Sequence, residues 1–158
     1  MTIEELSRDI VEQSSYIGNS VQDFHQDSFE KEGADFEESR RSKIICILEE
    51  SLIFLDGATI YDLLEIEAQK IFASYPAENF EDFWIKFLFH TSNMLERAIR
   101  KDQFLREDAK EIIQKNPELF TFLKALFTPI ENRYAIEIEE SELSYLMELI
   151  EVNLCLAY

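Results

Sequence analysis

Glycine and proline are scarce in this chain. Its 158 residues contain only three of each. Folds built from β-strands need many tight turns, and turns are where these two residues are used most. Hydrophobic residues nevertheless make up 46% of the chain, which is enough for a packed core. The composition therefore predicts an all-α fold, and the length predicts one domain with room for an additional arm.

Long apolar runs and basic residues are lacking as well. No stretch approaches the roughly 18 consecutive apolar residues that a membrane-spanning helix needs. The first residues, Met1 to Glu5, do not have the basic-then-apolar order of a signal peptide, so we expect a cytoplasmic protein that does not bind membranes. The 33 acidic and 15 basic residues give a formal net charge of -18. Because phosphate backbones repel such a chain, we expect no direct binding to nucleic acid.

Residues that commonly carry catalysis or bind metals are few and scattered. The two histidines, His25 and His90, lie 65 positions apart without an HExxH motif, and three separate glycines cannot form a phosphate-binding loop. No nucleophile elbow is present. Cys46 and Cys155 have apolar neighbours and no CxxC spacing, which favours buried, reduced thiols over a disulfide. We therefore predict no enzymatic activity, no cofactor and no metal site, and no role for His25 in its acidic surroundings.

Residues 80–101 contain the only tryptophan and the clearest helical period in the sequence. The residues Phe83, Phe87, His90, Met94 and Arg97 follow one another at steps of four, three, four and three. These steps place all five on one face of a helix. The pattern predicts a core face with a polar patch in its C-terminal half, and His90 is the candidate functional residue within it.

The rest of the chain predicts a series of helices separated by short breaks. We expect an amphipathic helix over residues 2–17, a linker or mobile arm over 18–36, and a regular helical pattern from residue 36 onward. Gly57 is predicted as the C′ residue that ends the first helix of this part, and Asn116 with Pro117 is predicted to start a later one. The further predicted helices span residues 60–75, 105–115 and 117–134, the last kinked or shortened at Pro129. An extended segment at 135–138 and a final helix from 140 or 141 are predicted to follow.

Three motifs between residues 80 and 154 resemble the PTS regulation domain (PRD) of bacterial transcriptional regulators. The first, FLFHTSNMLERAIRK, places His90 and Arg97 at the spacing of the family's phosphorylatable histidine and an arginine. The second is KNPELFTFLKAL. The third, IENRYAIEIEESELSYLMELI, is similar to the family's extended linker followed by an acidic helix start, and it contains Glu142. The resemblance implies a five-helix bundle, which we place over residues 39–158 with one or two extra N-terminal helices. The acidic composition of residues 1–38 predicts an arm or linker before it.

The sequence departs from the family pattern at two positions. Phe89 stands where many members have an aspartate before the first histidine, and Leu149 stands where many have a second histidine. The variant HTSNMLERAIRK is closer to the C-terminal domain of the sigma-N-dependent, NtrC-like activators of sugar operons. The stretch LEESLIFLDGA, residues 48–58, resembles the segment that leads into that domain.

The resemblance also implies a mechanism. His90 would receive a phosphoryl group from the phosphocarrier protein or from a sugar-specific IIB component of the phosphotransferase system. Arg97 would pair with the phosphate or, together with Glu142, support the site. The domain would form a homodimer whose geometry responds to the added charge, in a regulator of sugar utilisation.

Two other hypotheses explain the same residues. A PRD that has lost phosphorylation would act only as a dimerisation or docking module, with His90 as a packing residue. Alternatively, an acidic helical protein can mimic nucleic acid and inhibit a basic partner. The second hypothesis predicts that replacement of His90 leaves binding to that partner unchanged.

Overall fold

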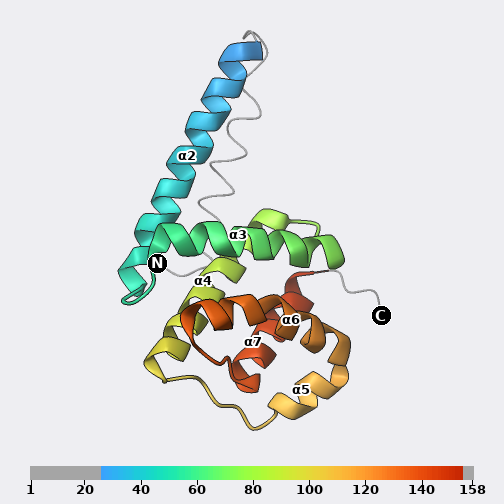
Figure 1. The fold of residues 1–158 in the computed structure, drawn as a ribbon. Coiled ribbons are helices and arrows are strands. Elements are labelled where there is room, and N and C mark those ends of the chain that lie inside the picture. The colour runs from blue at the N-terminus through green and yellow to red at the C-terminus, as the bar shows by residue number, and fades with distance from the viewer. Residues whose placement is uncertain (1–25, 155–158) are drawn as a thin grey trace.

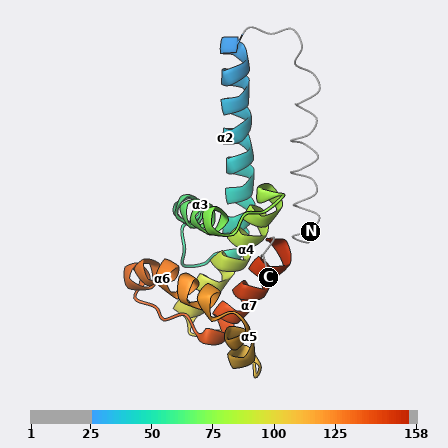
Figure 2. The same cartoon turned by 90° about the vertical axis from the view of Figure 1, so that its right-hand side faces the viewer.

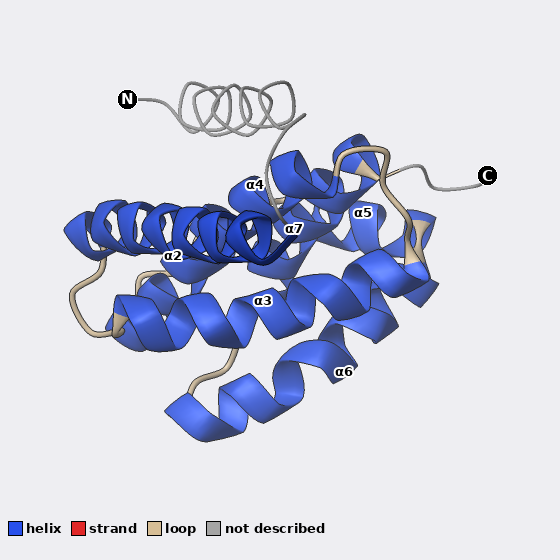
Figure 3. Ribbon diagram, turned by 90° about the horizontal axis from the view of Figure 1, so that it is seen from above, coloured by secondary structure: helices blue, strands red, loops and turns tan. Residues whose placement is uncertain are grey.

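The computed structural model describes residues 26–154, with side chains from residue 33 onward, and this part of the chain is helical throughout its regular structure (Figures 1 and 3). The predicted all-α fold is confirmed, and the described residues contain no strand. The helices are α2 (Gln26–Ser51), α3 (Gly57–Ser74), α4 (Phe80–Arg100), α5 (Ala109–Lys115), α6 (Pro117–Tyr134) and α7 (Glu140–Asn153). The five helices α3 to α7 form a bundle, and α2 is an additional N-terminal helix.

Helix α4 lies at the centre of the bundle, between α3 and α7 (Figures 1 and 2). The predicted core stripe is confirmed, since Phe83, Phe87 and Met94 are fully buried. Leu88 and Leu95, on other faces of the same helix, are also fully buried. A helix that buries residues around much of its circumference must be enclosed by neighbours. Helix α7 completes the enclosure, because it packs against α4, α5 and α6.

Polar side chains fix the starts of three helices. Asp56 accepts a hydrogen bond from the backbone N–H of Thr59, and Asn79 caps α4 in the same way. Asn116 caps α6, with Pro117 in the first helical position, as the sequence predicts. The prediction for Gly57 is wrong: α2 ends at Ser51, and Gly57 is the first residue of α3. The Asp56 side chain provides a stronger start signal at this point than glycine provides as a stop signal.

Helix α2 corrects the prediction of a linker over residues 18–36, because residues 26–36 are helical. The helix extends away from the bundle in both side views (Figures 1 and 2). Residues 33–35 and 37–39 are exposed, so this part has no core to face and needs no apolar stripe. Periodicity therefore carried no signal for it. The boundary predicted between residues 38 and 39 falls inside α2, and the division of the chain into two units there stays a prediction.

Two further local predictions fail for reasons of tertiary contact. Cys46 is exposed rather than buried, because Ile44 and Leu48 are the α2 residues that face the core. Helix α5 begins at Ala109 rather than Leu105, since the backbone N–H groups of Phe104 and Arg106 donate to side chains of α7 instead of to carbonyls of a helix. The predicted helix at residues 2–17, His25 and Cys155 lie outside the described residues.

Ala135 ends α6 in a left-handed conformation, with φ of 51° and ψ of 47°. Its backbone N–H donates a hydrogen bond to the carbonyl of Glu131, which closes the helix end. Glycine is the usual residue at this position because the β-carbon of alanine crowds the backbone there. The extended segment predicted at residues 135–138 is therefore wrong at its first residue, and residues 136–139 belong to no helix.

We predict that Ala135→Gly stabilises the protein by roughly 0.5–1 kcal/mol, because removal of the β-carbon relieves left-handed strain by more than glycine adds to the freedom of the unfolded chain. Urea denaturation measures this change in the free energy of unfolding. Ala125→Gly is the matched control, since Ala125 is exposed in the interior of α6 and should lose about 1 kcal/mol on the same substitution. Equal effects of the two substitutions would contradict the left-handed conformation at Ala135.

Candidate functional site

His90 is held in the middle of α4 by buried residues on either side of it. Phe89 is 7% exposed and Thr91 is fully buried, whereas His90 itself keeps partial access to solvent. The ring atom Nε2 is buried and has no hydrogen-bond partner. One edge of the imidazole is therefore buried, and any chemistry with an external partner must use the remaining part of the ring.

Burial lowers the pKa of His90 below its ordinary value of 6.5, since a charged imidazolium loses its hydration in this setting. The positive charge of Arg97 lowers this pKa further, and the negative charge of Glu142 partly opposes the change. At neutral pH the ring is consequently uncharged. A neutral imidazole has a free electron pair and is a competent nucleophile.

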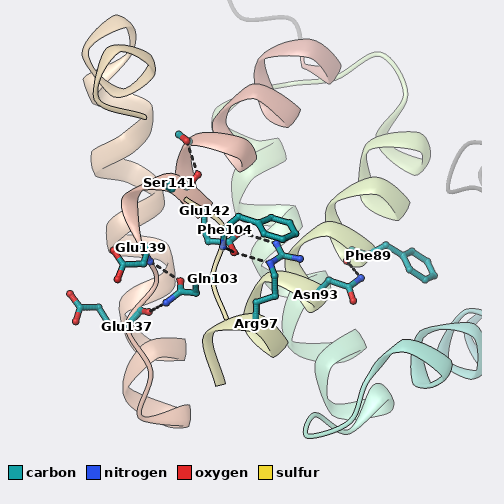
Figure 4. Close-up of polar contacts among 10 residues, drawn as sticks. Phe89, Asn93, Arg97, Gln103, Phe104, Glu137, Glu139, Ser141 and Glu142 are labelled. Atoms are coloured by element: carbon teal, nitrogen blue, oxygen red, sulfur yellow. Dashed lines mark hydrogen bonds and ion pairs between the residues drawn. The ribbon is translucent and has the colours of Figure 1, made fainter. Parts of the chain in front are cut away.

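Arg97 and Glu142 form a bidentate ion pair between α4 and α7 (Figure 4). The Nε and Nη2 atoms of Arg97 donate to Oε1 and Oε2 of Glu142, each over 2.8 Å. Glu142 is fully buried and the Arg97 side chain is only 12% exposed. Oε1 also accepts the backbone N–H of Phe104 at 2.9 Å, and the Phe104 ring lies 4.0 Å from the guanidinium carbon of Arg97. The structure thus joins two of the three residues singled out in the sequence.

The loop between α4 and α5 is bound to the region around this pair. The side-chain amide of Gln103 donates to the carbonyl of Glu137 and accepts the N–H of Glu139, both over 2.9 Å (Figure 4). Arg106 pairs with Glu148 at 2.9 Å, and its backbone N–H donates to the Ser141 hydroxyl. Sequence reasoning missed these contacts because polar residues in a loop carry no periodic signal.

Glu96 is a second buried carboxylate that the sequence did not single out. It is 2% exposed, and its Oε1 atom accepts the backbone N–H groups of Ile53, Phe54 and Leu55 over 3.1, 2.8 and 2.8 Å. Three donors of the α2–α3 loop thus satisfy one oxygen, as buried polar groups require. Among 33 acidic residues nothing in the sequence distinguishes this one. It connects α4 to the end of α2.

An open groove of about 490 Å³ lies beside the site, at the C-terminal ends of α4 and α6. Its walls include Ile99, Leu105 and Tyr134, and His90 does not line it. Within residues 26–154, no three side chains of the metal-binding types gather closely enough to hold a metal ion. The helices of that same part are all too short or too polar to cross a membrane.

A family model for the PRD domain matches residues 62–153, which is more than half of the chain. The chain belongs to the PRD family. The match runs from α3 to the end of α7 and encloses His90, Arg97 and Glu142. No curated protein and no solved structure matches the chain significantly. The PRD is a regulatory rather than a catalytic domain, and the resemblance drawn from the three motifs is confirmed at the level of the family.

For the PRD ion pair, we predict that Glu142→Ala costs about 3–5 kcal/mol of unfolding free energy, because it leaves the largely buried Arg97 and the Phe104 N–H without a partner. Glu148→Ala is the matched control. Glu148 also pairs with an arginine, but its side chain is 46% exposed, so the expected cost is about 0–1 kcal/mol. Denaturant titration of both variants tests the difference, and similar losses would show that burial does not govern the strength of the Arg97 pair.

The lowered pKa of His90 predicts a pH dependence of the PRD's stability. As the pH falls from about 6.5, the unfolded chain binds a proton at this residue before the folded chain does. The contribution of His90 to the free energy of unfolding is therefore fully present above about pH 6.5, and it is lost as the pH falls toward the pKa of the folded state. We expect wild type to lose more unfolding free energy between pH 7.5 and 5.5 than His90→Gln. Identical pH profiles for the two proteins would contradict a neutral, desolvated ring.

Proposed function

We propose that this chain is the regulatory domain of a transcriptional regulator of sugar utilisation, and that the phosphotransferase system controls it through a phosphoryl group on His90. Membership of the PRD family, with His90 inside the matched region, is the observation that carries the proposal. The motif variants favour a regulator of the sigma-N-dependent activator type. The donor would be the phosphocarrier protein or a sugar-specific IIB component, and the setting would be the cytoplasm.

The chemistry of His90 supports this role. Its ring is partly exposed and, because its pKa is lowered, neutral at the pH of a cell. A phosphohistidine of the donor can approach such a ring and transfer its phosphoryl group without prior loss of a proton from the acceptor. Fully solvated histidines are neutral for a smaller fraction of the time near pH 6.5.

A phosphoryl group on His90 would act on Arg97, whose positive charge already lowers the pKa of the ring. The guanidinium bonds to Glu142 through two nitrogen atoms, so a phosphate that attracts Arg97 competes with a buried carboxylate. Withdrawal of Arg97 would also remove its contact with the Phe104 ring. Phosphorylation would thereby alter the contact between α4, α7 and the loop that joins α4 to α5.

Charge repulsion offers a second route to the same control, in a homodimer. Two doubly charged phosphoryl groups ~10 Å apart repel by roughly 6 kcal/mol at an effective dielectric constant near 20, before screening by salt. A shift of a two-state equilibrium from 1:99 to 99:1 needs about 5.5 kcal/mol. The added charge is therefore large enough to change the geometry of a dimer even after a considerable reduction.

The competing candidate is a PRD that acts by contact alone. Two departures from the family pattern favour it, Phe89 and Leu149, and so does the bidentate pairing of Arg97 with Glu142. In that case His90 would be a packing residue and the domain a docking or dimerisation module.

Transfer of phosphate from phosphoenolpyruvate separates the two candidates. We expect that the chain gains one acid-labile phosphoryl group when it is incubated with enzyme I, phosphocarrier protein and phosphoenolpyruvate, with or without a IIB component. Intact mass spectrometry detects the added group. His90→Ala should abolish the gain, and His25→Ala, which changes the other histidine of the chain, should retain it.

Absence of phosphate with every donor, from a protein that is folded by circular dichroism, would reject the phosphorylation proposal and favour the docking module. Phosphate that persists in His90→Ala would assign the modification to a different residue.

A further inference from the structure

The two ring nitrogen atoms of His90 differ in their surroundings. The inference drawn from this difference rests on the proposed phosphorylation of His90. We propose that the phosphoryl group is attached to Nδ1 of His90 and that Nε2 serves as the buried end of the ring.

The exposure of the two nitrogens carries the proposal. Nε2 has no accessible surface and no hydrogen-bond partner. Nδ1, by contrast, is not among the buried atoms that lack a partner, and it forms no hydrogen bond with residues 26–154. The residue as a whole is partly exposed. A phosphoryl donor must approach along the axis of the new bond, with the leaving nitrogen opposite. At Nε2 that line of approach is closed, because the atom is buried.

The surroundings of Nε2 would also reject the product. Phe87 and Met94 flank His90 on the same face of α4, and both are fully buried. A phosphoryl group carries close to two negative charges and three oxygen atoms that require hydrogen-bond donors. Apolar side chains supply none, and no donor or acceptor lies within hydrogen-bond distance of Nε2. At Nδ1 the same oxygens can be hydrated.

The transfer balances without a further reactant. The reacting tautomer of His90 carries its proton on Nε2 and an electron pair on Nδ1. That pair forms the new N–P bond while the N–P bond of the donor phosphohistidine breaks, and the donor nitrogen recovers its own electron pair. The Nε2 proton stays on the ring throughout, so no proton needs to enter or leave at the buried Nε2 atom during the step.

Nitrogen-15 NMR of the phosphorylated protein tests the assignment. His25→Gln leaves His90 as the only histidine, so a sample labelled with ¹⁵N-histidine gives one pair of ring nitrogen signals. After phosphorylation with enzyme I, phosphocarrier protein and phosphoenolpyruvate, long-range proton–nitrogen correlation identifies each nitrogen, and one-bond coupling to ³¹P identifies the phosphorylated one. Spectra are recorded directly after transfer, in alkaline buffer, before the phosphoryl group can migrate.

We expect the phosphorus coupling on Nδ1 alone. Coupling on Nε2 in the earliest spectrum would overturn this proposal and leave the phosphorylation of His90 intact. A chain that accepts no phosphoryl group from any donor would overturn both the proposed function and this inference. The two failures are therefore distinguishable in one set of samples.

Discussion

The bidentate pair between Arg97 and Glu142 is the interaction on which the arrangement of the bundle depends. Burial of a carboxylate is costly unless it is paired, and here two guanidinium nitrogens and one backbone N–H provide the partners. These partners come from α4 and from the loop after it, while Glu142 belongs to α7. Their shared geometry fixes the distance and the register between the central helix and the last one.

Glu96 provides a second polar connection, which joins α4 to the loop between α2 and α3. It is the residue before Arg97, so its side chain leaves α4 about 100° away around the helix axis. The three backbone N–H groups that it accepts belong to the loop between α2 and α3. Consecutive residues of α4 thus connect it to α7 on one side and to the α2–α3 loop on the other. Apolar packing of Phe83 and Phe87 holds the N-terminal half of the same helix.

The sequence allowed prediction of those features that follow from periodicity and from local caps. The face of α4 and the start of α6 at Asn116 and Pro117 are both consequences of residues close together in the chain. Glu142 and Arg97 were found because they stand in family motifs, whereas their ion pair needs contacts 45 positions apart. Glu96 was missed for the same reason, since its three partners lie more than 40 positions away. The exposed part of α2 was missed because a helix without a buried face has no apolar stripe.

The position of the proposed phosphorylation site follows from these constraints. His90 lies two helical turns before Arg97 on the same face of α4. Within the part of the chain that the structure describes, the one cation that acts on its pKa is already bound to a buried carboxylate. A phosphoryl group at this point would therefore attract the arginine that holds α4 to Glu142 of α7. Had the arginine been free and solvated, the new charge would have been paired at little cost to the rest of the fold. The buried carboxylate is therefore what would convert a local modification of His90 into a change in helix packing.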